Sequence, residues 1–327
     1  MLGISADSGK AIIARYRAGG LVCLLFALLL PVHALADSGN RTIQVVLSKS
    51  GSVYQDFATR LVANIELSGS PIVVTVATDP GAASPAVRPS LYIPVGVRAL
   101  EAVVQDRGNV PVMAALVPRI TFEELIKNSD KDCRSGKSCS AMVLDQPIER
   151  QIRLVEALFG DSGAMGLLTT QRSEQLARKY MDSARRHRIL AEKEIIETAD
   201  DLVPGLERLL KRSRYLLAIP DPVIFNTTTL KHILLTTYRY RQPVIAFSPG
   251  YVKAGALAAV YSTPEDVADD ISAWINGWLS SGVNGLPAPM SPTSFSIEYN
   301  DWVARSLGIN IDSKSVLLKK IREGKSS

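Results

Sequence analysis

The sequence is poor in the residues that most active sites and metal sites use. It contains three Cys and three His in 327 residues, and aromatic residues make up only 6%. The first apolar run is followed by SKSGSV, which lacks the G-x-G-x-x-G fingerprint of dinucleotide binding. Gly136-Lys137-Ser138 lacks the glycine that a P-loop carries five positions earlier, where Lys131 stands. We therefore expect no cofactor and no metal ion.

The positive charge is too small and too dispersed for nucleic-acid binding. The first 36 residues contain Lys10, Arg15 and Arg17 against Asp7, so they carry +2 of the formal net charge of +5 and leave +3 on the remainder. Binding to a polyanion requires Lys and Arg gathered on one face. Nucleic acid is therefore not an expected partner.

Residues 1–36 have the pattern of a secretory signal peptide. A basic stretch precedes the apolar run GLVCLLFALLLP, and the small residues of Ala34-Leu35-Ala36 suit signal peptidase. The run is well short of the ~20 residues that span a bilayer, which disfavours the alternative of an uncleaved anchor. We predict cleavage after Ala36 and a soluble periplasmic protein.

The remaining cysteines, Cys133 and Cys139, lie in the polar stretch KDCRSGKSCS. A close pair in an oxidising compartment is most simply a disulfide, with two free thiols as the alternative. Their spacing and the absence of a neighbouring His disfavour zinc binding.

Short apolar runs alternate with helical patterns along the mature chain. Continuous apolarity is what a strand covered on both faces requires, so the pattern predicts parallel sheets and an α/β fold. Five such units precede about residue 146 and four follow it, which predicts two doubly wound lobes with a cleft between them. The runs are 43–47, 71–78, 91–95, 110–117, 141–144, 164–168, 215–219 and 243–247, with a weaker candidate at 188–195.

Two helix starts carry a capping box, in which a hydroxyl residue is followed three positions later by an acid. Thr263 and Asp266 flank a proline at the first helical position. Thr121 and Glu124 have the same spacing. Helices are therefore expected to begin at both places.

Gly160-Asp161-Ser162-Gly163 is similar to the surroundings of the nucleophile in trypsin-like proteases. That chemistry needs a histidine held by a carboxylate, and the mature chain offers only His187 and His232, in or beside predicted helices. The glycines are better explained as a turn between a helix and a strand. A secreted hydrolase or transferase remains an alternative, and we expect a protein that is not an enzyme.

Three segments of the C-terminal third carry a family resemblance. The Pro220-Asp221-Pro222 turn, Ser248–Ala256 and Asn300–Ile309 resemble the ABC-transporter substrate-binding family typified by tryptophan- and tyrosine-binding periplasmic lipoproteins. LDQPIERQ (144–151) resembles a hinge element of some members. The resemblance implies a type I periplasmic-binding fold and a small polar or amino-acid-like ligand. It also implies an ABC permease and ATPase as partners, through which alone the protein meets the membrane.

The resemblance also implies how the chain divides between two lobes. We expect residues 37–146 and about 252–285 in lobe I, and residues 147–251 and about 286–327 in lobe II. Closure of the lobes on a ligand would give the two-state signal that a permease senses. A sensor subunit that signals to a membrane receptor is the alternative within the same fold.

Candidate ligand contacts in lobe II follow the predicted strands. Asp221 is expected either to accept hydrogen bonds from a ligand or only to form the Asp-Pro turn. Ser248 and Tyr251 offer a hydroxyl and a stacking face. Thr169 and Thr170 precede a helix whose first N–H groups suit a carboxylate, or they serve only as caps.

Lobe I offers fewer candidates. Gly96 and Arg98 follow a predicted strand, and Arg98 is either a partner for a ligand carboxylate or a surface charge. Asp145 and Gln146 end the fifth predicted strand at the crossover between lobes. Ligand contact, a hinge role and capping of the next helix all remain open for them.

Overall fold

The computed structural model describes residues 41–82, 88–106, 109–129, 133, 138–160, 162–281 and 285–323. The expected signal peptide and its cleavage site at Ala36 lie outside the described residues. Among the helices that are described, none combines the length and the apolarity needed to cross a bilayer.

The strands form two sheets. Within each sheet the second strand in chain order lies at the edge, next to the first, and the later strands follow on the other side of the first. The first sheet has the order β2-β1-β3-β4-β5 and is parallel throughout. The second has the order β7-β6-β8-β9-β10-β11, in which only β11 is antiparallel. Both are doubly wound sheets whose strand order reverses next to their first strand. The predicted α/β fold with two parallel-sheet lobes is confirmed.

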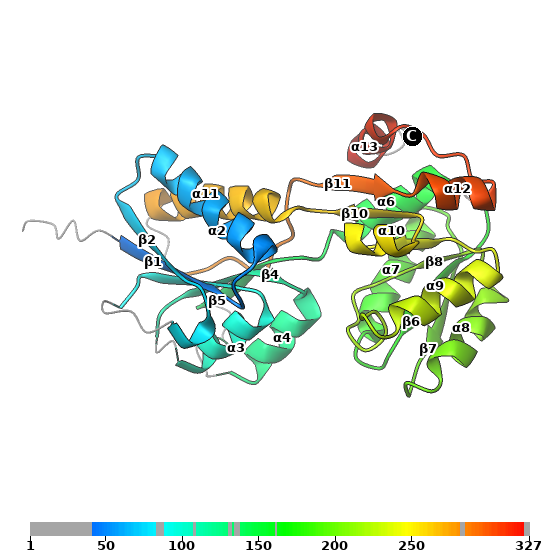
Figure 1. The fold of residues 1–327 in the computed structure, drawn as a ribbon, viewed down its shortest axis with the longest axis horizontal. Helices are drawn as coiled ribbons and strands as arrows, with labels where there is room; N and C mark the ends of the chain where they lie inside the picture. The colour runs from blue at the N-terminus through cyan, green and yellow to red at the C-terminus, as the bar shows by residue number, and fades with distance from the viewer. Residues whose placement is uncertain are drawn as a thin grey trace, which may run out of the picture. The chain divides into compact units, whose positions relative to one another are not determined.

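The first sheet is covered by helices on both faces (Figure 1). On one face α2 and α11 pack together over a core that includes Phe57, Leu61 and Ile271. On the other face α3 and α4 cover a core that includes Leu100 and Phe122. Double coverage explains why its central strands read as unbroken apolar runs. Its elements are β1 (Arg41–Leu47), α2 (Ser52–Leu67), β2 (Ile72–Ala77), η2 (Pro80–Ala82), β3 (Leu91–Val95), α3 (Val97–Asp106), β4 (Val112–Val117), α4 (Arg119–Lys127), β5 (Cys139–Val143) and α11 (Pro264–Ser281).

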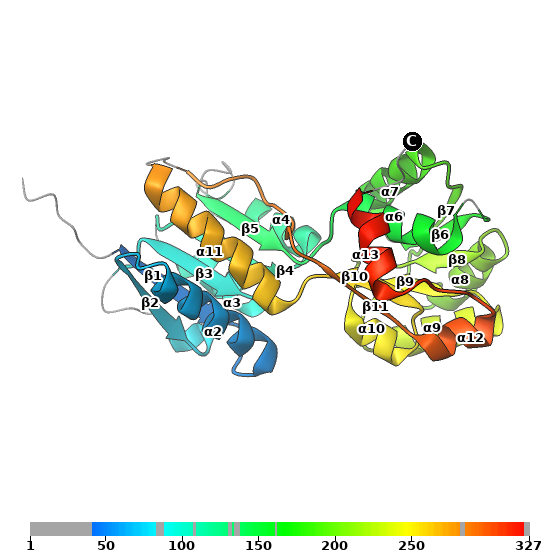
Figure 2. The ribbon, with the colours of Figure 1, turned by 90° about the horizontal axis from the view of Figure 1, so that it is seen from above.

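The second sheet is also covered on both faces. Helices α6, α7 and α13 share a core built around Tyr180 and Tyr215, and α8, α9 and α10 share the core on the other face. Helix α13 lies along α6, as Figure 2 shows. Its elements are α6 (Ile148–Phe159), β6 (Met165–Thr169), α7 (Glu174–Arg186), β7 (Ala191–Ile195), α8 (Leu202–Leu210), β8 (Tyr215–Leu217), α9 (Leu230–Arg239), β9 (Val244–Ala246), α10 (Pro249–Ala254), β10 (Ala258–Tyr261), β11 (Ser296–Tyr299), α12 (Asp301–Leu307) and α13 (Lys314–Glu323).

The chain returns to the first sheet later than the expected residue 252. Strand β10 pairs with β9 and β11, so residues 258–261 are part of the second sheet. Helix α11 then packs on α2, and Met290 beyond it pairs with Met142 of β5, so the chain also leaves the first sheet later than the expected residue 285. The return is late because Ala258–Tyr261 (AAVY) forms a mostly buried strand, which was not among the predicted apolar runs.

Of the two expected capping boxes, one is present. The amide of Asp266 donates to Thr263 Oγ1 at 3.1 Å, and the amide of Thr263 donates to Asp266 Oδ2 at 2.9 Å. The prediction of a cap at Thr121 is wrong, because α4 already begins at Arg119.

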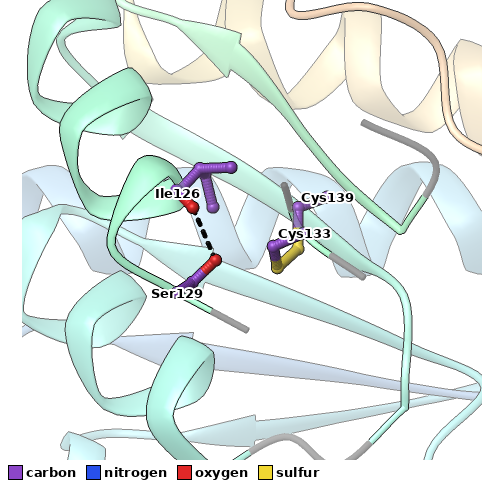
Figure 3. The surroundings of a disulfide bond; sticks show 4 residues. All are labelled: Ile126, Ser129, Cys133 and Cys139. Carbon is purple, nitrogen blue, oxygen red and sulfur yellow. Dashed lines mark hydrogen bonds between the residues drawn. A yellow bond between two sulfur atoms is a disulfide. The ribbon is translucent and has the colours of Figure 1, made fainter. Parts of the chain in front are cut away.

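The predicted disulfide between Cys133 and Cys139 is present, and it lies beside the end of α4 (Figure 3). Both cysteines are buried in the core beneath α3 and α4. Nearby, Ser129 Oγ donates to the carbonyl of Ile126 at 2.7 Å and closes the last turn of α4. The disulfide therefore links the start of β5 to Cys133, which follows α4 in the chain.

Candidate functional site

Several sequence-predicted residues lie at the carboxyl ends of strands, where doubly wound sheets bind ligands. In the second sheet the strand order reverses between β6 and β8. Thr169 and Thr170 stand at the end of β6, and Asp221 follows β8. In the first sheet the reversal lies between β1 and β3, and Gly96 follows β3.

Asp221 is buried and its carboxylate accepts hydrogen bonds on both oxygens. Oδ2 accepts from Thr170 Oγ1 at 2.7 Å and from Ser173 Oγ at 2.6 Å. Oδ1 accepts from the amide of Val223 at 2.9 Å. The side chain is 1% exposed, so this carboxylate bonds to the protein itself and braces the turn after β8.

Thr169 and Thr170 belong to the same buried network. Thr169 Oγ1 lies 2.8 Å from Ser173 Oγ, and Thr169 is fully buried. The amide of Thr170 lies 3.1 Å from Ser173 Oγ. These hydroxyls tie the loop after β6 to the turn after β8, and they support neighbouring side chains that are more accessible.

An aromatic cluster lies at the same edge of the second sheet. The rings of Phe247 and Tyr251 have centroids 5.0 Å apart, and those of Phe225 and Phe247 are 6.1 Å apart at nearly a right angle. Phe225 follows β8, whereas Phe247 and Tyr251 follow β9. Phe225 is buried in the core on this face, whereas Phe247 and Tyr251 are half-buried, so the accessible ring surface at these strand ends belongs to Phe247 and Tyr251.

Tyr251 and Ser248 have polar atoms with no protein partner among the described residues, and both side chains are half-buried. Burial raises the pKa of the Tyr251 phenol to about 12. Ser248 stands before α10, and its side chain makes no capping hydrogen bond. A neutral phenol and a hydroxyl beside aromatic rings can hold a small ligand that has both an apolar and a polar part.

In the first half, Gly96 has a backbone that other residues rarely adopt. Its φ is +87°, and a Cβ at this position would lie 2.6 Å from Ser48 Oγ and 2.9 Å from Tyr54 Cε1. Ser48 Oγ also accepts the amide of Ala99, in the first turn of α3, at 3.0 Å. Arg98 is exposed and makes no hydrogen bond or ion pair in the described part of the chain, so its guanidinium is available.

Asp145 and Gln146 bond to other segments of the chain. The amide of Arg119 donates to Asp145 Oδ2 at 2.6 Å, at the start of α4. Burial raises the pKa of Asp145, and this amide opposes the rise. Gln146 Nε2 donates to Ser262 Oγ at 2.9 Å, and Ser262 Oγ donates to the carbonyl of Ser294 at 2.5 Å. The three segments that connect the two sheets are thus joined by side-chain hydrogen bonds.

Sequence reasoning missed Ser173, Phe225 and Phe247. Phe247 is the last residue of an apolar run, and Phe225 follows the Pro-Asp turn at helical spacing, so a search for aromatic residues just beyond strand ends would have found both. Ser173 gave no such signal, because its partner Asp221 lies 48 residues away in the chain.

Comparison with known proteins identifies the fold. No family model matches the sequence, and neither does any curated protein. A solved domain from Streptococcus pneumonia in complex with L-Trp is 15% identical, with a TM-score of 0.57 over 86% of this chain and 98% of that one. The ligand-free, open structure of a substrate-binding protein with adhesive properties from Clostridium difficile is 16% identical, with a TM-score of 0.63 over 84% and 96%. A conserved domain protein from Vibrio cholerae is 15% identical, with a TM-score of 0.56 over 86% and 98%.

The chain therefore has the type I periplasmic-binding fold, as the sequence resemblance implied. These similarities define the architecture, in which two doubly wound sheets are joined by several crossings of the chain.

Proposed function

We propose that this protein is a periplasmic solute-binding protein of an ABC import system. It binds a small polar or amino-acid-like ligand by hinge closure and releases it chemically unchanged. A permease and its ATPase receive the ligand, and the protein meets the membrane only through that permease. The signal peptide expected at residues 1–36 delivers the protein to the periplasm.

The observation that carries this proposal is the group of accessible residues at the carboxyl edge of the second sheet. Tyr251 and Ser248 present polar atoms that have no partner within the described ranges, next to the rings of Phe225 and Phe247. A ring surface with a few polar groups is the usual composition of a small-molecule site. The L-Trp bound by the similar Streptococcus pneumonia domain supports an amino acid with an apolar side chain.

The connecting segments support a hinge. Gln146, Ser262 and Ser294 are joined through a chain of side-chain hydrogen bonds, so the three segments are held together where they pass between sheets. A few side-chain hydrogen bonds are enough to keep these connecting segments aligned. Rotation of the backbone within the segments can then move one lobe without changing either sheet, as a hinge requires.

A thermal-shift screen of amino acids, small aromatic compounds and organic acids tests the proposal. A ligand at 100 times its dissociation constant should stabilise the protein by about 2.7 kcal/mol. Tyr251→Ala should weaken binding of the hit about tenfold, as measured by calorimetry. Tyr238→Ala is the matched control, because Tyr238 is an exposed tyrosine on α9 and should leave the affinity unchanged.

Small-angle scattering provides the second test. The hit should lower the radius of gyration of the protein, as lobe closure requires. Binding without compaction would contradict the hinge, and a screen in which only nucleotides or metal ions stabilise the protein would contradict the ligand class.

A further inference from the structure

A cavity lies away from the candidate ligand site, beside the start of α6. Its volume is about 550 Å³, and the segment that precedes β11 and the end of α13 form its other walls. Three arginines line it: Arg150 and Arg153 from α6, and Arg322 from α13. Glu149 is the carboxylate that accompanies them in the lining.

Glu149 does not neutralise these arginines, because other groups occupy its carboxylate. His187 Nε2 lies 2.9 Å from Oε2, and Ser183 Oγ donates to Oε1 at 2.9 Å. Arg186 bonds to Oε1 as well. The Glu149 carboxylate therefore bonds to residues in and just after α7. Three arginines against this one carboxylate leave the lining of the cavity with an excess of positive charge.

The three guanidinium groups form no ion pair with any carboxylate in the described ranges. Arg150 donates to the carbonyls of Pro292 and Thr293 at 3.1 Å, and Arg153 donates to the carbonyl of Ile321 at 3.0 Å. Arg153 Nε is buried and has no hydrogen-bond acceptor in the part of the chain that is described. Buried donors without an acceptor are rare, so the contacts of Arg153 within the described ranges leave part of its hydrogen-bonding capacity unused.

The ring of Phe295 helps to hold two of the guanidinium groups. Arg150 Cζ lies 4.2 Å from the ring centroid, and Arg322 Cζ lies 5.6 Å from it. Stacking on a ring fixes the plane of a guanidinium and reduces the entropy that it loses on binding an anion. Burial also lowers the pKa of Arg150, and Asp270 only partly opposes this effect. An anion in the cavity would relieve that cost.

We propose that this cavity binds a phosphate group, either as inorganic phosphate or as part of a small phosphate ester. Guanidinium groups recognise phosphate through paired N–H donors, which a single ammonium group cannot provide. The N-terminal end of α6 adds a partial positive charge beside the cavity, although the amides of Arg150 and Gln151 already donate to the carbonyl of Pro147. This site uses none of the residues proposed to contact the transport ligand, but it adjoins the connecting segments, because Ser294 lines it and Arg150 donates to Gln146 Oε1 at 2.5 Å.

Calorimetric titration with inorganic phosphate tests the proposal, with potassium chloride at matched ionic strength as the reference. We expect saturable binding of phosphate and none of chloride. Arg322→Gln should weaken phosphate binding about tenfold, since it removes one charged donor set. Arg305→Gln is the matched control, because Arg305 is an exposed arginine on α12 outside the cavity and should leave the affinity unchanged.

Titration with glucose 6-phosphate separates the two sources of the phosphate group. Tighter binding than inorganic phosphate identifies an ester as the ligand, and equal or weaker binding identifies the free ion. If wild-type protein shows no saturable binding of either probe, the proposal is overturned, whatever the variants do. The same follows if Arg322→Gln and Arg305→Gln bind phosphate equally well.

Discussion

Thr170 Oγ1 donates a hydrogen bond of 2.7 Å to Asp221 Oδ2, and this bond ties the end of β6 to the end of β8. The two strands flank the position at which the strand order of the second sheet reverses. Doubly wound proteins bind their ligands at such positions. The bond therefore fixes the two strand ends next to the candidate site. Tyr251 and Ser248 of that site are more accessible than the buried Thr170 and Asp221.

Asp221→Ala should destabilise the protein by about 3 kcal/mol, because it leaves several buried donors without an acceptor. Urea unfolding measures this change. Asp182→Ala is the control, since Asp182 is 61% exposed and its ion pair with Arg185 should contribute less than about 1 kcal/mol. Equal stability of the two variants would show that the network around Asp221 is not structural.

Acid stability should depend on Glu149. Burial by itself would raise the pKa of this carboxyl, but hydrogen bonds from Arg186, His187 and Ser183 lower it from 4.5 to about 2. A lowered pKa stabilises the fold above the unfolded value, and the contribution is lost as the pH falls through the folded value. The free energy of unfolding should therefore decrease between about pH 4.5 and pH 2, partly through this group.

Glu149→Gln should flatten the pH dependence of unfolding in that window. Glu101→Gln is the matched control, because Glu101 is exposed on α3 and should leave the slope unchanged. Wild-type slope in the Glu149→Gln protein would disprove the assignment.

The disulfide should make a measurable contribution to stability. Cys133 and Cys139 are six residues apart, and closing so short a loop lowers the entropy of the unfolded chain by an amount worth about 2 kcal/mol. Urea unfolding with and without a reducing agent measures it. The double variant Cys133→Ser, Cys139→Ser should unfold like the reduced protein and show no response to the reductant. A response in that variant would mean that the reductant acts elsewhere.

The sequence predicted the strands that are covered on both faces, because such strands must be continuously apolar. All eight such runs contain strands, from β1 to β9, and the weaker run at 188–195 contains β7. Strand β10 escaped because alanine-rich runs suit a helix as well as a strand, and β11 escaped because SIEY is short and half polar. The apolar runs predict where strands occur but not the order in which they pair within a sheet.

Sequence patterns predicted a helix start correctly where the hydrogen bonds that cap it join residues close together in the chain. The capping box at Thr263 needs only residues three positions apart, and it is present. At α4 the first amide bonds to Asp145, which lies 26 residues away, and the helix begins at Arg119 where no local signal stands. The same limit applied to the candidate site. Tyr251 and Ser248 were found from their place after a strand, whereas the partners of Asp221 depend on the tertiary fold.

Glycine at position 96 should be needed for stability, and glycine at position 277 should not. Gly96→Ala must adopt a φ of +87° and place a Cβ 2.6 Å from Ser48 Oγ, which should cost about 2 kcal/mol or more. Gly277 lies within α11, and a Cβ added there would meet no described atom within 4 Å, so Gly277→Ala should stabilise the protein by about 0.5–1 kcal/mol. Urea unfolding of both variants gives the comparison. Shifts of the same sign would contradict the backbone argument, because the two substitutions add the same methyl group and differ only in the conformation that receives it.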